Sequence, residues 1–566
     1  MGSIIKKKVK KYHYYYFVES ARVNGKPRIV NQVYLGTADT IMQKMNDIEA
    51  RKTPLYSMVL DFADVTLLYD VATRLGVIEI IDKHASKRKQ GVSVGMYALI
   101  AAINRAVAPT SKRCIAEWYS ATVLPKILPV SATALAPQNY WNHMKVSDEI
   151  LSAIDEEIVG RIISQYGVDT SRLIYDATNF YTYIDTKSPG QLAKRGKNKE
   201  KRNDLKIVGL SMMITPDCNI PLLYDTYPGN KPDAKQFPEM VTKLKERFER
   251  LTHRSSDVTV VFDRGNNSED NIFLLEAGDF SFDYVGGLKR NQHPDLYVIG
   301  KDSYVALEGD SLQGCRAFRT TRTIYSREMT VVVVYNPKLY EGQMQGIAAN
   351  MEKTTAKLSQ LQARLQARAD GRITKGRAPT SESVEKQVKS ILSTEFMNDI
   401  FSYGMTTVNA IATFVYTIHG ENLIELQETV LGKTALFTSR HDWSTEEITA
   451  AYRSAWHVEH AFMQMKDKDN LTVRPLFHWT DEKIKVHMFY CILAYRLCCI
   501  LMKELQSELL EKHSINKILD NLSTIKHVTT VLGTTKRDII PSFSKGTNLA
   551  EAISTLYDLK IKYLPS

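Results

Sequence analysis

The segment from residue 172 to residue 286 constrains the fold most strongly, because strand and helix patterns follow one another there in a legible order. Three short apolar runs come first, and a helix, a strand, a second helix and a last strand follow. We expect strands at 172–177, 206–215, 220–226, 257–262 and 282–286, and helices at 233–251 and 268–277. This β-β-β-α-β-α-β order predicts an α/β fold with a mixed sheet covered by helices.

The regions on either side of this segment have different patterns. Residues 1–56 are predicted to form a basic β-hairpin unit that turns at Asn24-Gly25. Residues 57–168 follow helical spacing, either as a DNA-end-binding domain or as a bundle without direct contacts. The predicted domains are therefore 1–56, 57–168, a core from 169–289 and 441–510, an insertion at 290–440, and a helical C-terminal region at 511–566.

The insertion combines strands with a helical hairpin. Strands are expected at 323–335 and 409–438, and the hairpin at about 345–400. Its apolar positions keep coiled-coil-like spacing, at Met351, Leu358, Leu361 and Leu365 on one arm and at Val384, Val388 and Ile391 on the other. The tip at 369–383 is rich in Gly, Arg, Thr and Ser, and a solvated loop is favoured there over a DNA contact.

Composition and charge narrow the class of protein. The 566 residues carry a net charge of +11, which is typical of a globular chain with a polyanionic partner but does not require one. None of the six cysteines forms a CxxC pair, which argues against a zinc ribbon or a disulfide framework and favours a reducing compartment. The longest apolar run, 486–502, contains Arg496, and we interpret it as a buried core helix rather than a membrane span. The protein is expected to be cytoplasmic, without a membrane partner.

Two basic stretches are candidates for contact with DNA. Residues 1–36 carry eight Lys and Arg against one Glu, and a solvated hairpin and a DNA-contacting arm are about equally favoured. Residues 187–206 carry eight Lys and Arg against two acids, and this loop joins the first two predicted strands. We favour DNA contact for the loop because of that position, with Lys194, Arg195 and Lys197 as its candidate residues.

Three acids stand out by their places in the predicted layout. Asp176 and Asp263 each follow an apolar strand, where a sheet edge holds a carboxylate rigidly. Glu459 lies in a predicted helix beside Val458 and Phe462. Each acid alone is as well explained by a cap or a turn. Together they could hold two divalent cations, Mg²⁺ or Mn²⁺, because hard cations prefer oxygen ligands.

Glu459 also belongs to a regular series. Tyr452, Glu459 and Lys466 are seven residues apart each time, so a continuous helix would project all three from one face. A hydroxyl, a carboxylate and an ammonium on one stripe suit a metal-bound phosphate. A coincidental spacing on a surface helix is the competing explanation. The neighbouring His457 and His460 are better explained as core or surface residues than as proton carriers.

These residues resemble a known family. Tyr452, Glu459 and Lys466 match the Y-x2-R-x3-E-x6-K signature of DDE insertion-sequence transposases, the YREK group with an RNase H-like catalytic domain. Asp176 in YDATNF and Asp263 in FDRGNNSEDN look like the first and second aspartates of that family. The stretch from 474 to 480 and the helical segment after it also look like a subgroup of these enzymes.

The resemblance implies roles for further residues and has one departure. It implies that Asp176, Asp263 and Glu459 are catalytic and bind two metal ions. It also implies that Tyr452, Lys466, Arg264 and Arg474 contact DNA. The signature arginine falls at Ala455, so its phosphate contact is absent or is made by Arg453 or Arg474. By analogy Trp443 could stack on an unpaired base, but packing within the protein is favoured.

The resemblance implies a transposase of bacterial, nucleoid-associated location. Such an enzyme binds terminal inverted repeats, cleaves to expose 3′-hydroxyl ends and joins them to target DNA. Because two ends must meet, we expect a dimer or a larger assembly on DNA. Two alternatives remain open, an RNase H-like nuclease that does not join strands and a domesticated DNA-binding protein that no longer cuts.

Overall fold

The computed structural model describes residues 2–23, 25–52, 54–89, 91–185, 187–196, 202–252, 258–278, 280–509, 513–533 and 538–564. These residues form two compact units. The first comprises Met1–Ile158, Asp467–Pro475 and Glu482–Ser566. The second comprises Val159–Lys466 and Leu476–Asp481. The second unit contains all three predicted catalytic acids.

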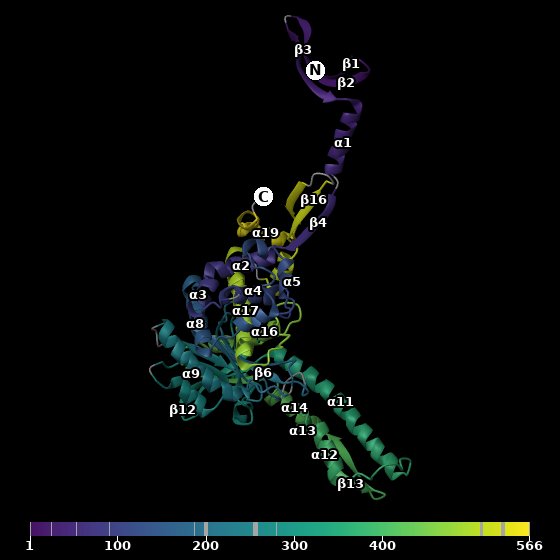
Figure 1. Cartoon of the computed structure of the whole chain (residues 1–566). Helices are drawn as coiled ribbons and strands as arrows, with labels where there is room; N and C mark the ends of the chain where they lie inside the picture. The colour runs from purple at the N-terminus through teal and green to yellow at the C-terminus, as the bar shows by residue number, and fades with distance from the viewer. Residues whose placement is uncertain are drawn as a thin grey trace. The chain divides into compact units, whose positions relative to one another are not determined.

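A large mixed sheet organises the second unit (Figure 1). Its strands parallel to their neighbours are β5 (Arg172–Tyr181), β8 (Thr259–Phe262) and β9 (Asp283–Gly287). The antiparallel strands β6 (Ile207–Ile214) and β7 (Pro221–Pro228) extend the sheet from β5, while β15 (Lys433–Thr438), β12 (Arg327–Tyr335), β11 (Arg316–Ile324) and β10 (Val305–Ala306) extend it from β9. The predicted α/β class and the β-β-β-α-β-α-β order are confirmed.

Helices cover the sheet because its strands are apolar on both faces. Every residue of β6 is buried. On one face, Phe237 of α9 (Asp233–Thr252) packs against Tyr175 of β5 and Phe262 of β8, with ring centroids 4.9 Å apart in both pairs. The short helix α10 (Glu269–Glu276) begins where the Ser268 hydroxyl accepts the N–H of Asn271. Alternate residues of β5 and β8 therefore face away from α9.

The predicted helical hairpin exists and has its own core. It consists of α11 (Pro337–Ala369) and α12 (Ser381–Leu392), which pack on the β-hairpin β13 (Phe401–Val408) and β14 (Ile411–Ile418) (Figure 1). Leu358, Leu361, Val384 and Val388 are buried there together with Phe414. The shorter helices of this region are α13 (Met397–Ile400) and α14 (Gly420–Thr429).

Two predicted strands of the insertion were too long. Between 409 and 438 the chain makes a tight turn with positive φ at Asn409 and Ala410, then β14, then α14, and only afterwards β15. In the same way, the predicted strand at 323–335 is split by a turn at Tyr325 and Ser326, which also have positive φ. Apolar residues continue through both regions, so the pattern alone did not reveal the breaks.

The first unit begins with three strands rather than a hairpin. They are β1 (Gly2–Val9), β2 (Tyr12–Val23) and β3 (Lys26–Gly36), and they form an antiparallel sheet. The helix α1 (Ala38–Lys52) and the strand β4 (Pro54–Asp61) follow. The sequence instead predicted that the hairpin unit continues to residue 56 and that helical structure begins at residue 57. The strand β1 was not predicted, because most of its side chains are exposed. It therefore lacks the alternation of apolar and polar residues that identifies a strand in a sequence.

The remaining elements of the first unit are mainly helices. The N-terminal group is α2 (Ala63–Leu75), α3 (Val77–His84), α4 (Val94–Val107), α5 (Ile115–Ser120), α6 (Leu124–Ile127), α7 (Pro137–His143) and α8 (Asp148–Tyr166). The long apolar helix is α17 (Asp481–Leu509), and 94% of its most apolar window is buried within the protein. The prediction of a core helix around Arg496 is therefore confirmed.

The C-terminal region is not wholly helical as predicted. Strands β16 (Lys526–Leu532) and β17 (Asp538–Phe543) lie between α18 (Ile515–Leu522) and the helices α19 (Asn548–Leu556) and α20 (Leu559–Tyr563). β16 pairs with β4 as well as with β17, so its main partner comes from the other end of the chain. Local sequence carries no signal for such a long-range pairing.

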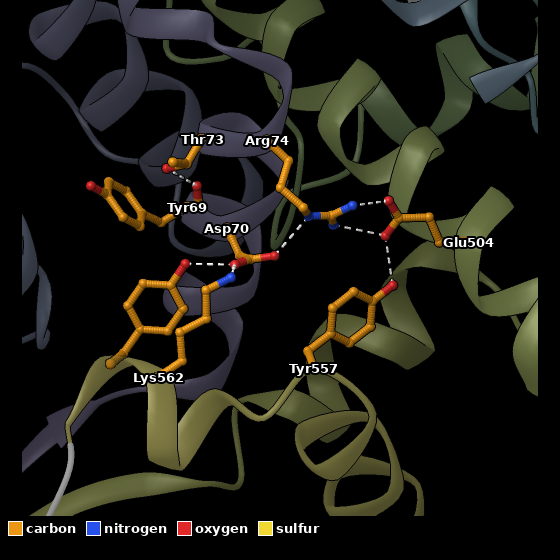
Figure 2. A network of polar contacts seen from close by, with 8 residues as sticks. Tyr69, Asp70, Thr73, Arg74, Glu504, Tyr557 and Lys562 are labelled. Atoms are coloured by element: carbon orange, nitrogen blue, oxygen red, sulfur yellow. Dashed lines mark hydrogen bonds and ion pairs between the residues drawn. The ribbon is translucent and has the colours of Figure 1, made fainter. Parts of the chain in front are cut away.

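A polar network ties the C-terminal helices to α2 (Figure 2). The buried carboxylate of Asp70 accepts hydrogen bonds from Arg74 at 2.8 Å and from Tyr563 at 2.6 Å, and it also pairs with Lys562. Arg74 reaches on to Glu504 of α17, which accepts the hydroxyl of Tyr557. Burial raises the pKa of Asp70, but the hydrogen bonds from Lys562, Tyr563 and Arg74 outweigh it and leave that pKa below its usual value.

We expect Asp70→Asn to destabilise the protein at pH 7 by about 1–3 kcal/mol, because Arg74, Lys562 and Tyr563 lose a buried, charged acceptor. The lowered pKa means that the carboxylate's contribution is complete above the unfolded-state pKa, near 3.9, and is lost as the pH falls through the folded-state pKa. The wild type should therefore lose more stability than the variant between pH 5 and pH 3. Thermal melts across that range measure the difference. Asp47→Asn, on the exposed face of α1, is the control.

Candidate active site

The two predicted aspartates come directly after paired residues of neighbouring strands. Tyr175 of β5 pairs with Phe262 of β8 in parallel register; Asp176 is the next residue of β5, and Asp263 is the first residue after β8. Tyr175 and Phe262 face α9, and the backbone of Asp263 is still extended, so strand alternation directs both carboxylates to the opposite side of the sheet. The strand register therefore predicts that the two acids lie on one side of the sheet.

Local hydrogen bonds fix the backbone after Asp263. Its side chain accepts the N–H of Arg264 at 2.7 Å and so caps the single 3₁₀ turn Arg264–Asn266. The Asn271 side chain donates to the carbonyl of Asn266 at 2.6 Å, and the Asn267 side chain donates to that of Gly287 on β9. These bonds hold an exposed carboxylate on an ordered loop.

The signature residues lie on two consecutive helices rather than one. Tyr452 belongs to α15 (Thr445–Arg453), Glu459 belongs to α16 (Trp456–Met465), and Lys466 is the C-cap of α16. At the break, the Ser454 hydroxyl donates to the carbonyl of Ala451 and competes with the regular helical pattern. The predicted single helix is therefore corrected to two helices with a short interruption.

Tyr452 and Lys466, the first and last residues of the series, both contact the sheet on the side away from α9. The Tyr452 hydroxyl donates to Asp263 at 3.3 Å. Burial and the nearby Asp263 raise the pKa of Tyr452, so its phenol stays protonated as a donor. Gly287 permits this approach, since a Cβ there would collide with the Tyr452 hydroxyl.

Lys466 makes the matching contact on the neighbouring strand. Its Nζ donates to the hydroxyl of Thr178 at 2.7 Å and lies 5.4 Å from the ring centroid of Phe180. Thr178 is two residues beyond Asp176 on β5, so it shares that aspartate's face. The helices α15 and α16 thus extend from Asp263, which follows β8, to β5, which carries Asp176.

Glu459 lies on α16, between these two anchors in sequence, and is exposed. Its neighbours Val458 and Phe462 are buried as predicted. His457 contacts the side chain of Asn219 at 2.6 Å and stacks on Trp456, while burial lowers the pKa of His460. Throughout the described part of the chain, no three His, Cys, Asp or Glu side chains are grouped closely enough to hold a metal ion. Asp176, Asp263 and Glu459 therefore do not form one such group in this structure.

The candidate DNA contacts have different surroundings. Arg195 and Arg264 are exposed, and Lys194 is half-buried because its backbone pairs with Ile207 in both directions. Lys197 lies outside the described residues. Arg474 belongs to the first unit, where its carbonyl accepts a hydrogen bond from the buried Arg105 at 3.1 Å.

Arg453 is exposed and Trp443 is half-buried, and both side chains have neighbours. The guanidinium of Arg453 contacts the sulfur of Cys315 at 3.4 Å. Trp443 lies beside two guanidinium groups, at 5.7 Å from Arg172 and 5.3 Å from Arg440. The favoured interpretation of Trp443 as a packing residue agrees with these contacts.

The sequence analysis did not identify two features of the second unit. It did not single out Thr178, the partner of Lys466, because a threonine in a strand carries no special signal. It also missed a cavity lined by Tyr183, Phe477 and Trp479. The sequence signal for this cavity is two pairs of alternating aromatic residues, Tyr181-x-Tyr183 and Phe477-x-Trp479. The two pairs lie almost three hundred residues apart, so the sequence alone does not show that they meet.

The fold defines a mixed α/β protein in which two aspartates directly follow paired residues of parallel strands. The chain belongs to the family described as "Transposase DDE domain", whose model matches residues 168–497. The predicted transposase is therefore confirmed at the level of the family.

Two further comparisons were made with known proteins. A solved structure, the cryo-EM structure of the piggyBac transposase synaptic complex with hairpin DNA, is similar over 82% of this chain and 80% of that chain, with 10% sequence identity and a TM-score of 0.38. No curated protein matches the chain.

Proposed function

We propose that this transposase binds the terminal inverted repeats of an insertion sequence, cleaves to expose 3′-hydroxyl ends and joins those ends to target DNA. The observation that carries the proposal is that Asp176 and Asp263 directly follow the paired residues Tyr175 and Phe262, while Tyr452 contacts Asp263 and Lys466 contacts Thr178 beyond Asp176. The order β7-β6-β5-β8-β9 supports an RNase H-like core. The spacing of Tyr452, Glu459 and Lys466 supports the YREK group.

The carboxylates fit divalent cations by their chemistry. Asp176 and Asp263 offer hard oxygen ligands on one face, and Glu459 would complete the set, so these residues would hold Mg²⁺ or Mn²⁺. When bound, two such ions would supply the charge that stabilises phosphoryl transfer. Tyr452 orients Asp263 through its hydrogen bond, and Lys466 positions a phosphate. Water is the nucleophile in cleavage, and the released 3′-hydroxyl is the nucleophile in joining.

One experiment separates this function from the two alternatives. Purified protein is incubated with Mg²⁺ or Mn²⁺, a DNA carrying a pair of element ends, and a target plasmid. A transposase yields nicked ends and end–target joints. Nicks without joints would favour the nuclease, and binding without nicks would favour a DNA-binding protein that no longer cuts. Light scattering of the DNA complex measures whether two or more chains assemble on paired ends.

The basic N-terminal sheet supplies a test of DNA binding. We expect the triple change Lys6→Glu, Lys7→Glu and Lys8→Glu to weaken binding to element ends and to reduce the slope of log affinity against log salt. The slope should fall by roughly one for each lost phosphate contact, because fewer counterions are released. The triple change Lys338→Glu, Lys353→Glu and Lys357→Glu, at exposed positions of α11, is the charge-matched comparison. An unaltered slope in the triple variant would mean that these lysines are only solvated.

A further inference from the structure

An open cavity of about 360 Å³ lies in the second unit, apart from the acids. Tyr183, Phe477 and Trp479 supply its aromatic wall, and Asp185, Lys187 and Ser188 supply polar groups. Its volume is at the lower end of the range for small-molecule sites, about 300–1,000 Å³. A cavity of this size suits a single ring system better than an extended ligand.

The three aromatic side chains of this cavity are unusually accessible for their size. Tyr183 is 46% exposed, Phe477 52% and Trp479 50%. The rings of Tyr183 and Phe477 have centroids 5.9 Å apart and are tilted by 44°. Single exposed apolar residues are common on proteins, but a contiguous group around a hollow marks a binding surface. The three exposed rings therefore suit a ligand with flat apolar faces.

Hydrogen bonds hold the two segments that carry the rings. The Tyr183 N–H donates to the carbonyl of Leu476 at 3.0 Å, and the Ser188 hydroxyl donates to that of Trp479 at 3.0 Å. The Asp481 carboxylate accepts the N–H groups of Gln191 at 2.7 Å and Leu192 at 3.0 Å. The rings are thus presented by an ordered frame, which lowers the entropy cost of binding.

One exposed basic side chain of the cavity wall can meet an anionic group of a ligand. Lys187 is exposed in the cavity wall. Lys206 donates to the carbonyl of Ser188 at 3.0 Å, and Arg202 lies 5.8 Å from the ring of Tyr181, although Asp204 neutralises it. Asp185 is the one acid of the wall, and its carboxylate accepts the N–H of Lys187 at 2.9 Å. Aromatic rings beside basic groups are typical of surfaces that bind single-stranded nucleic acid.

We propose that this cavity binds an unpaired nucleobase of DNA, stacked on Phe477 and Trp479, with the adjoining phosphate near Lys187. The proposal rests on the proposed function for its choice of DNA as the ligand. Tyr183 is seven residues beyond Asp176, which is roughly 20 Å along an extended chain. The bound base would therefore be several nucleotides from the phosphate that is cut. Stacking on rings accepts any base, so the site would be tolerant of sequence.

Binding of the full-length protein to a fluorescent twelve-residue oligothymidylate tests the proposal. We expect Phe477→Ala and Trp479→Ala each to weaken binding by roughly fivefold to a hundredfold, as for other stacked bases. Phe273→Ala removes an equally exposed ring from α10 and should leave the affinity unchanged. Wild-type tryptophan emission should be quenched by the oligonucleotide. Trp479→Phe should keep most of the affinity but lose most of the quenching.

Two results would overturn the proposal. One is unchanged affinity in both alanine variants together with unchanged quenching in Trp479→Phe. The other is a light-scattering mass of the Phe477→Ala or Trp479→Ala variant that differs from the wild-type mass while DNA binding is unchanged. The cavity would then be a contact between protein chains. Neither result would contradict the proposed enzymatic function, because cleavage by the wild type and its dependence on Asp176 would be unchanged. If the proposed enzymatic function were wrong, the wild type would not cleave DNA, while Phe477→Ala and Trp479→Ala would still weaken binding of the oligonucleotide.

Discussion

Replacing Asp176 or Asp263 by alanine is expected to abolish both cleavage and joining, with a rate loss of at least about a thousandfold. The two acids directly follow residues that are paired on neighbouring parallel strands, so either substitution would remove one of the proposed carboxylate ligands. Both chemical steps should fail together because one site serves both. Glu459→Ala should have a similar effect if this residue completes the site.

The measurement is a gel assay of nicked and joined products on element-end DNA, run beside a binding assay. Binding should stay close to the wild-type level, because the acids are not expected to contact phosphate directly. Lys466→Ala, which removes the contact with Thr178, should be milder than any acid variant. Asp204→Ala, an exposed acid of the basic loop, is the control. Near wild-type cleavage by Asp176→Ala or Asp263→Ala would contradict the assignment of the site.

Arg496→Met is expected to destabilise the first unit by about 3–5 kcal/mol. Arg496 lies in the middle of the apolar helix α17 and is fully buried, and its guanidinium pairs with Asp155 of α8, whose side chain is only 4% exposed. The substitution keeps the volume of the side chain but leaves a buried carboxylate without its cationic partner. The large effect therefore comes from the isolated charge rather than from a cavity.

Thermal and urea unfolding of the full-length protein measure this loss. The double variant Arg496→Met with Asp155→Leu should regain much of the stability, because it removes both charges. Lys389→Met breaks the exposed pair with Glu385 on α12 and should change little. If the single variant at Arg496 were as mild as the one at Lys389, the buried pair would not stabilise the unit.

Much of the fold could be predicted because it depends on local periodicity. The strands and helices between 172 and 286 were placed within a few residues of their true ends, except that β5 continues to Tyr181. The two arms of the helical hairpin were also recognised, since their buried residues repeat at helical spacing. The apolar runs before Asp176 and Asp263 were recognised as strands, but the predicted position of Asp176 at the end of its strand was wrong, because β5 continues to Tyr181. Side-chain period is a property of neighbouring residues, so a single sequence reveals it.

The tertiary structure alone decided which distant residues meet. It paired β16 with β4, Arg496 with Asp155, and Lys466 with Thr178. It divided the predicted signature helix into two helices and did not bring Asp176, Asp263 and Glu459 together as one three-acid group. It also brought Tyr183 beside Phe477 to form the aromatic cavity. Strand register and contacts between distant segments depend on how whole elements pack. The spacing of residues along the chain determined the elements and the candidate acids, whereas long-range packing determined their partners.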